Sequence, residues 1–213
     1  MFQTTPRYRQ IIERIDAANA ADPHHATDPA SGATVASEVL YGQRMSAMLA
    51  RYAPDASEAV HVAVRAQHIQ RWQIPRSDYP QTTFGYKQWR AHLARFHAET
   101  TATLMHEAGY DEDMIQRTRA IVGKLGIKVN PESQLLEDVA SLVFFTHYLN
   151  DFMARHPEYD APKWQGILHK TWQKMSHRAH AYVLNHIPLP FDPAAYGLTV
   201  ATEPPPPPAP AST

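Results

Sequence analysis

Apolar residues recur at helical spacing along most of this chain, and short clusters of proline, glycine and aspartate interrupt them. Spacings of three and four residues are typical of helices that bury one face, and 8 glycines in 213 residues leave few breaks inside such helices. We therefore predict an all-α fold, a single domain of about seven to eight helices spanning residues 1–187. The predicted helices cover residues 6–20, 34–52, 57–72, 84–107, 111–122, 131–155, 161–175 and 176–186.

The stretches between these helices are predicted as loops. Residues 21–32 and 74–80 are rich in turn formers, and Gly109 is expected to end the long helix before it. The helix over 131–155 is the most apolar, so we expect it at the centre of the fold. Residues 188–213 contain five consecutive prolines and too few apolar side chains for a core, which predicts a disordered tail.

The charge balance and the absence of cysteine exclude several classes of protein. With 20 basic and 21 acidic residues, no overall field attracts nucleic acid or anionic lipid, so no nucleic-acid partner is expected. No segment has the apolar length of a signal peptide or a membrane span, which predicts a cytoplasmic protein without membrane contact. The sequence has no thiolate donor and lacks the glycine-rich phosphate loop, the HExxH zinc motif and the Gly-x-Ser-x-Gly elbow. It does not indicate an oligomeric state.

Histidines and carboxylates emerge from otherwise apolar helices at several points. Imidazole and carboxylate donors without thiolates suit a catalytic divalent metal, manganese, iron or zinc, although the sequence makes none of them certain. The candidate residues are His61, His68, His97, Glu99, His106, Glu137 and Asp138.

Structural explanations compete with the metal for each of these residues. His68 alone is equally well explained as a core histidine bonded to a backbone carbonyl. Helical positions two residues apart differ in direction by about 200°, so His97 is the better ligand candidate and Glu99 the better ion-pair residue. Glu137 and Asp138 also diverge, so only one of them would face a shared site. The remaining histidines fit a core boundary and a helix end.

A second set of residues combines arginine with aromatic rings. Guanidinium groups hold phosphate or carboxylate with paired hydrogen bonds, and neighbouring rings can stack on a flat ligand. An exposed arginine face over a tryptophan boundary explains most of the set at least as well. Arg76 is the exception, because it lies in a proline-flanked loop of the kind that positions ligand-contacting residues. The set comprises Arg65, Arg71, Trp72, Arg76, Tyr79, Trp89, Arg90 and Arg95.

Four segments of the chain resemble a known family. Residues 40–46, 65–80, 96–99 and 136–140 are similar to the uncharacterised bacterial and fungal family catalogued as domain of unknown function number 4202. The resemblance spans most of residues 6–186, and its long segment RAQHIQRWQIPRSDYP is specific. That family is similar in turn to the HD superfamily, whose helical domains bind metal through a histidine, a His-Asp doublet and a late aspartate. The resemblance therefore implies an HD-like helical domain.

The resemblance also implies a set of site residues. His68 matches the doublet histidine, His97 the additional histidine of two-metal members, and Asp138 the late aspartate; these three are the implied catalytic and metal-binding residues. The pattern departs at two positions, because Ile69 replaces the doublet aspartate and Tyr41 lies near the place of the first histidine. Other carboxylates would have to complete such a site. The possible extra ligands are Glu38, Glu99 and Glu137.

The implied function is a metal-dependent hydrolase that acts on a small phosphorylated substrate. A metal-activated water would attack the phosphorus, with arginine steadying the anion. The substrate-binding candidates are Arg65, Arg76, Trp72 and Tyr41. Two alternatives stay open: a non-catalytic HD-like pocket that binds a small anionic ligand or a partner protein, and a di-iron oxygenase of the HD type. The missing doublet aspartate argues against an ordinary single-metal phosphohydrolase.

Overall fold

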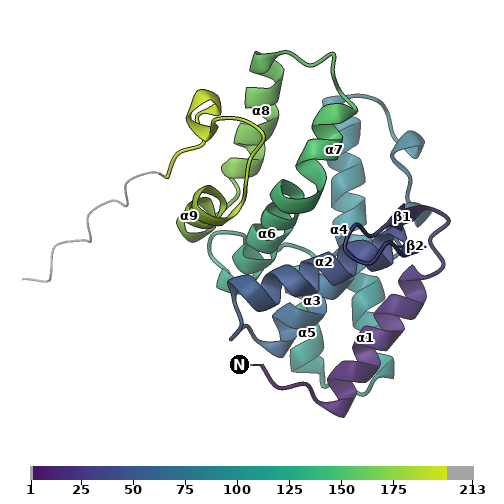
Figure 1. Cartoon of the computed structure of the whole chain (residues 1–213). Coiled ribbons are helices and arrows are strands. Elements are labelled where there is room, and N and C mark those ends of the chain that lie inside the picture. The colour runs from purple at the N-terminus through teal and green to yellow at the C-terminus, as the bar shows by residue number, and fades with distance from the viewer. Residues whose placement is uncertain (1, 201–213) are drawn as a thin grey trace, which may run out of the picture. The chain divides into compact units, whose positions relative to one another are not determined.

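A computed structural model describes residues 2–200 and separates the chain into two compact units, unit 1 (Met1–Val143) and unit 2 (Phe144–Thr213). Helices build both units, and the described part of the chain contains one two-stranded sheet (Figure 1). The prediction of an all-α fold is confirmed.

Most helices of unit 1 begin at a polar residue that caps them. The side chains of Thr5, Ser57, Thr82 and Asp111 each accept the backbone N–H three residues further on, which satisfies a donor that a helix start leaves open. The helices are α1 (Pro6–Asn19), α2 (Ser37–Tyr52), α3 (Glu58–Ala66), α4 (Thr83–Glu107), α5 (Glu112–Val122) and α6 (Pro131–Val143), with the 3-10 turns η1 (Arg71–Gln73) and η2 (Arg76–Asp78) between α3 and α4.

The short helix α3 lies at the centre of unit 1, in contact with α1, α2, α4, α5 and α6 (Figure 1). Its sequence EAVHVAVRA carries small and β-branched side chains, and all of its residues except Glu58 and Arg65 are buried. Small side chains let neighbouring helices approach closely from several directions. The sequence predicts the central helix within 131–155, because that segment is the most apolar. In the structure, small side-chain size indicates the central helix better than hydrophobicity does.

The helix predicted over 57–72 is shorter than expected. α3 ends at Ala66, residues 67–70 form a turn, and Gln70 adopts a left-handed conformation with φ 50°. The prediction that His68 lies on a helix is therefore wrong. No glycine or proline marks this break in the sequence; the turn is held by a contact with α1 that only the fold supplies.

A β-hairpin lies partly in the loop predicted over residues 21–32 and partly in the first three residues of the helix predicted over 34–52, which begins at Ser37. Strands β1 (His25–Thr27) and β2 (Thr34–Ala36) pair antiparallel, and Gly32 takes φ 70° in the turn between them. Strands of three residues are too short to produce an alternating pattern that a sequence can show.

Unit 2 begins with a π-helical turn, η3 (Phe144–Tyr148), which is followed by α7 (Leu149–Ala154). The helical segment predicted over 131–155 is thus divided into α6, η3 and α7, and residues 2–200 contain nine α-helices where about seven to eight were expected. The other helices of unit 2 are α8 (Ala161–Trp172) and α9 (His177–His186), and the 3-10 turn η4 (Pro193–Tyr196) follows them.

The first part of the predicted tail packs within unit 2. Leu198, just after η4, is 1% exposed, and the indole N–H of Trp172 donates to the backbone carbonyl of Thr199 at 3.1 Å. The remainder of the predicted tail, with the five-proline run, falls on residues 201–213 and lies outside the described residues.

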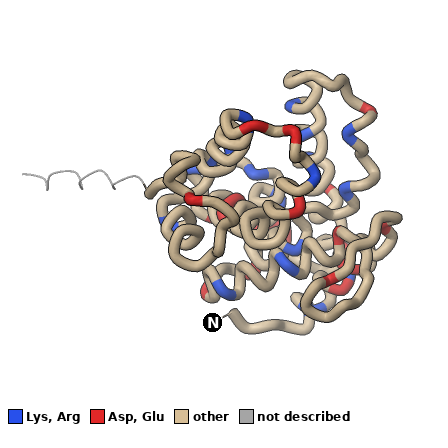
Figure 2. Tube along the Cα trace, turned by 45° about the horizontal axis from the view of Figure 1, so that its top comes forward, with Lys and Arg blue, Asp and Glu red and all other residues tan. Residues whose placement is uncertain are grey.

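Basic and acidic residues are interspersed along the trace in both units (Figure 2). Among residues 2–200, no helix combines the length and the hydrophobicity needed to cross a membrane.

Candidate functional site

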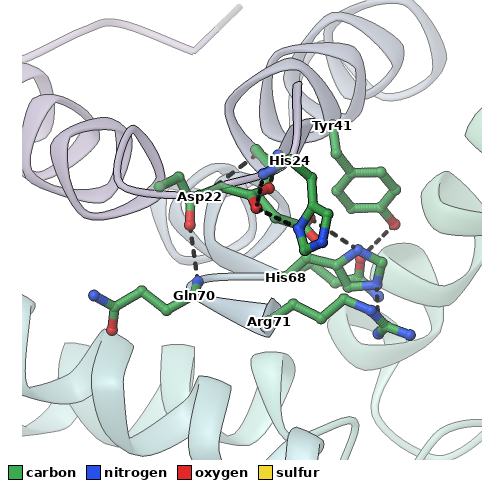
Figure 3. Close-up of polar contacts among 9 residues, drawn as sticks. Asp22, His24, Tyr41, His68, Gln70 and Arg71 are labelled. Atoms are coloured by element: carbon green, nitrogen blue, oxygen red, sulfur yellow. Dashed lines mark hydrogen bonds and ion pairs between the residues drawn. The ribbon is translucent and has the colours of Figure 1, made fainter. Parts of the chain in front are cut away.

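The turn at residues 67–70 positions His68 in unit 1. The backbone N–H of Gln70 donates to Oδ1 of Asn19 at 2.8 Å, and the N–H of Arg71 donates to the carbonyl of His68 at 3.0 Å (Figure 3). Between them Ile69 is fully buried among apolar side chains of α1, α3 and α4. Ile69 anchors the turn in the apolar core, and the neighbouring His68 side chain points away from that core.

The contacts of His68 define its protonation. Nη1 of Arg71 lies 3.3 Å from Nε2 of His68, and because a guanidinium can only donate, Nε2 carries a lone pair (Figure 3). Nδ1 therefore holds the proton and lies 3.4 Å from Oε2 of Glu38. The ring of Tyr41 stacks on the imidazole at 4.0 Å and 13°. Burial first, then the charge of Arg71, holds the pKa of His68 well below its usual value, which keeps it neutral at pH 7.

Glu38 lies in the first turn of α2, where a buried aspartate fixes the backbone. Oδ2 of Asp22 accepts the Glu38 N–H at 3.1 Å, and Oδ1 accepts from both the backbone and the ring of His24 at 2.9 Å (Figure 3). Burial raises the pKa of Glu38 to about 7; Asp22 adds to the rise, and Arg71 opposes it. Near neutral pH, Glu38 therefore exists in both charged and uncharged forms.

His97 faces the same region from the middle of α4. It is 4% exposed, and its ring centre lies 6.0 Å from that of His68. The backbone carbonyl of Gln67 favours a proton on the ring nitrogen that it faces, and Nε2 of the ring is buried without a hydrogen-bond partner among the described residues. Burial, followed by the charges of Arg71 and Arg90, lowers the pKa of His97 to about 3.

A small cavity lies between these histidines and three cationic side chains. Its volume is about 20 Å³, counted as space open to the centre of a water molecule, and one water needs roughly 10–15 Å³ on this measure. The enclosed space therefore holds one or two water-sized atoms, and because the cavity is partly open, the rest of a larger ligand would project out of it. The polar residues that line the cavity are Gln67, His68, Arg71, Arg90, His97 and Lys124.

Two of the cations, Arg71 and Arg90, come from η1 and from α4. The guanidinium of Arg71 lies 4.8 Å from the ring centre of Trp89, whose indole N–H donates to the carbonyl of Ile74 at 2.9 Å. Arg90 follows Trp89 on α4 and has no hydrogen bond or ion pair within the described part of the chain. Sequence analysis had placed both arginines in the basic and aromatic set.

The third cation, Lys124, was missed by sequence analysis. It follows α5 in a left-handed conformation, φ 57°, with its N–H bonded to the carbonyl of Ile121 and that of Leu125 to the carbonyl of Ala120. This is a Schellman ending, in which glycine is the usual residue at the left-handed position. Nζ of Lys124 lies 2.5 Å from Oε2 of Glu137. A lysine after a glycine in a loop gave no sequence signal.

Of the four predicted carboxylates, Glu38 lies beside His68, whereas Asp138, Glu137 and Glu99 do not line the cavity. Asp138 accepts from Gln134 at 2.9 Å and from the hydroxyl of Tyr52 at 3.4 Å. Glu137 does not line the cavity, and it pairs with Lys124, which does. Glu99 pairs with Arg119 on the open surface between α4 and α5.

The predicted substrate-binding residues are also divided. Arg65 forms a two-hydrogen-bond pair with Asp16, at 2.7 and 2.5 Å, outside the cavity. Arg76 donates to backbone carbonyls of its own loop, at 2.9 Å and 2.8 Å. Trp72 is half-buried in η1 and does not line the cavity. Tyr41 alone lies at the site, stacked on His68.

The donors around the cavity fit a metal ion poorly. Within residues 2–200 no three His, Cys, Asp or Glu side chains are grouped as metal ligands. The lone pair of His68 Nε2 already accepts a hydrogen bond from Arg71. The three cationic side chains near both imidazoles would repel a divalent cation. Metal binding stays a prediction, and the cavity is better suited to an anion.

Comparison with known proteins identifies one protein family that the chain matches. A family model described as "Domain of unknown function (DUF4202)" matches residues 9–195. No match was found among curated proteins or among solved structures, so the relation to the HD superfamily also stays a prediction.

Proposed function

The chain belongs to the DUF4202 family, whose description names no activity, and from the geometry of unit 1 we propose that the protein binds a small oxyanion in the cavity between His68 and His97. Phosphate and carboxylate groups are the ligands that this set of side chains would recognise. The observation that carries the proposal is the convergence of Arg71, Arg90 and Lys124 on one small space.

The electrostatics around the cavity support this proposal. Glu137 pairs with Lys124. The carboxyl of Glu38 has a pKa raised to about 7, so at neutral pH it is only partly ionised and neutralises the cationic side chains only in part. No carboxylate lines the cavity itself. Like charges held close together in a partly buried site cost free energy unless a counter-charge binds between them, and a small anion would supply it.

Backbone strain around the cavity is a second support. Among residues 2–200, three residues other than glycine have positive φ, and two of these, Gln70 and Lys124, adjoin or line the cavity. A left-handed conformation costs roughly 1–2 kcal/mol for such residues, and strain of this kind concentrates at binding sites. A lysine where glycine would relieve the strain is consistent with a need for its ammonium group.

Isothermal titration calorimetry with inorganic phosphate tests the proposal. Arg90→Gln removes the cation that has no partner among the described residues, and Arg95→Gln is its matched control, an exposed arginine on the same helix that does not line the cavity. We expect phosphate to bind the wild type, about tenfold more weakly to Arg90→Gln, and with little change to Arg95→Gln. Absence of phosphate binding to the wild type, or equal losses in the two variants, would contradict the proposal.

Hydrolysis of a bound phosphoester is a second candidate function. The pairing of Glu38 with Nδ1 of His68 favours it, because a carboxylate behind an imidazole fixes the tautomer that a general base requires. Nε2 of His68 would have to exchange the N–H of Arg71 for a water. The low pKa of His68 makes it a weak base, so the geometry favours binding over turnover.

An assay with p-nitrophenyl phosphate separates the two functions. Release of nitrophenol that is lost in both Glu38→Gln and His68→Asn, with phosphate binding retained in Glu38→Gln, would establish hydrolysis. Binding of phosphate without turnover would leave the anion-binding function alone. Metal-dependent hydrolysis and oxygen activation by two irons have less support, because three cations and no carboxylate line the cavity, and Glu38 is the single carboxylate paired with either histidine among the described residues.

A further inference from the structure

One residue that lines the cavity, His97, has a buried ring nitrogen, Nε2, without a hydrogen-bond partner among the described residues. The backbone carbonyl of Gln67 can only accept, so it favours a proton on the ring nitrogen that faces it; because Nε2 has no partner, we assign that proton to Nδ1. Nε2 therefore keeps its lone pair in the neutral ring.

The surroundings of His97 preserve this lone pair. The cationic groups of Arg71, Arg90 and Lys124 all oppose a positive charge on the ring. A buried acceptor without a donor is unfavourable, and a ligand that supplies the donor removes that penalty. The cavity thus offers cationic donors together with one neutral acceptor.

We propose that the ligand is an oxyanion that carries its own proton, hydrogen phosphate, and that its O–H donates to Nε2 of His97 while its other oxygens accept from Arg71, Arg90 and Lys124. This inference rests on the proposed anion pocket and goes beyond it, because it distinguishes anions of equal charge. An oxygen without a proton would meet the lone pair of His97 and be repelled, whereas an O–H makes a hydrogen bond there.

Three dianions at pH 8 test the inference. Hydrogen phosphate keeps one proton, sulfate has none, and methyl phosphate has none because the second pKa of a phosphate ester is about 6. The three ions have the same charge and a tetrahedral centre, and the main difference among them is the proton that only hydrogen phosphate carries. Calorimetric titration of the wild-type protein should give hydrogen phosphate an affinity about tenfold or more above that of sulfate and of methyl phosphate.

Two variants connect this preference to His97. His97→Leu removes the acceptor, so hydrogen phosphate should bind no better than sulfate while the affinity for sulfate does not fall. Leu93→Met is the matched control, since Leu93 lines the same cavity without a polar group, and it should keep the preference. If His97→Leu does not fold, the comparison of the three anions with the wild type still decides the question.

The other outcomes overturn the inference in distinguishable ways. Equal binding of all three dianions would leave the anion pocket in place and remove the role of the proton. Tight binding of methyl phosphate together with hydrogen phosphate would show recognition of the phosphoryl group without its proton. Binding of none of them would contradict the proposed function and this inference with it.

Discussion

Oδ1 of Asn19 accepts the backbone N–H of Gln70 at 2.8 Å, so the last residue of α1 holds the turn that presents His68. Asn19 is 1% exposed, and water cannot readily take its place. The same side chain lies 3.5 Å from the carbonyl of Glu38 through its Nδ2. One buried amide therefore connects the two segments that carry Glu38 and His68.

Asn19→Ala should weaken both the fold and the site. The variant leaves the N–H of Gln70 without an acceptor in a left-handed turn, at a cost of about 1–3 kcal/mol in the free energy of unfolding. Phosphate affinity should fall as well, because His68 and Arg71 are no longer held in place. Urea unfolding and calorimetry measure the two effects.

A double-mutant cycle with Gln70→Gly provides the control. Glycine keeps the backbone N–H and adopts a φ of 50° without strain, so Gln70→Gly should raise stability and leave the cost of Asn19→Ala unchanged. A much smaller cost of Asn19→Ala in that background would mean that Asn19 acts by holding the strained backbone and not through the hydrogen bond alone.

Glu38→Gln should change how stability depends on pH. Burial raises the pKa of Glu38 in the folded protein to about 7, from 4.5 in the unfolded chain. The contribution of protonated Glu38 to the free energy of unfolding is fully present below pH 4.5. It is lost as pH rises through 7, and the loss amounts to about 3 kcal/mol. The variant should therefore gain stability relative to the wild type between pH 5 and pH 8, measured by urea unfolding at four pH values.

The neutral ring of His97 affects the free energy of unfolding with the opposite dependence on pH. Its pKa is lowered to about 3, so its stabilising contribution is lost as pH falls below 6.5. In Glu38→Gln, stability should therefore rise more steeply with pH between 4.5 and 6.5 than in the wild type. Glu13→Gln, at an exposed position of α1, serves as the control. Parallel curves for the wild type and Glu38→Gln would refute a buried Glu38 with a raised pKa.

Arg65→Met should reduce stability without reducing phosphate affinity. Arg65 is 10% exposed and its guanidinium is committed to Asp16, so the loss should be about 1–3 kcal/mol. Thermal unfolding and phosphate titration of the variant are the measurements. If phosphate affinity fell as far as in Arg90→Gln, Arg65 would belong to the binding site after all.

Phosphate should raise the melting temperature of the protein, whereas manganese should not. A ligand that binds only the folded state stabilises it in proportion to the logarithm of its concentration over its Kd. Differential scanning fluorimetry with millimolar phosphate, Mn²⁺, Zn²⁺ or Fe²⁺ makes the comparison. A metal that raised the melting temperature of the wild type, and not of His68→Ala, would restore the metal site implied by the HD resemblance.

The helices could be predicted from the sequence because their caps and their apolar spacing are local. Asp111 opens α5 as expected, and Gly109 takes φ 77° where the end of α4 was predicted. The break after Ala66 could not be predicted, since it depends on Asn19, far away in the sequence. Local patterns specify helices, and tertiary contacts decide where some of them stop.

The candidate site was predictable in part for the same reason. His68 and His97 stood out because each interrupts an apolar face, and the structure brings their rings within 6.0 Å. Lys124 lies in a loop without periodicity, so its approach to the cavity depends on the ending of α5. Ile69, where the HD pattern has aspartate, is fully buried in the core, so a carboxylate there would face apolar side chains.

The cavity draws its groups from the turn after α3, from α4 and from the segment after α5. During synthesis, a nascent chain that ended at Val122 would already contain both histidines and both arginines, yet it would lack Lys124 and the helix that bears Glu137. Anion binding would consequently report that the segment after α5 had folded against the cavity, and phosphate could serve as a folding sensor for that step.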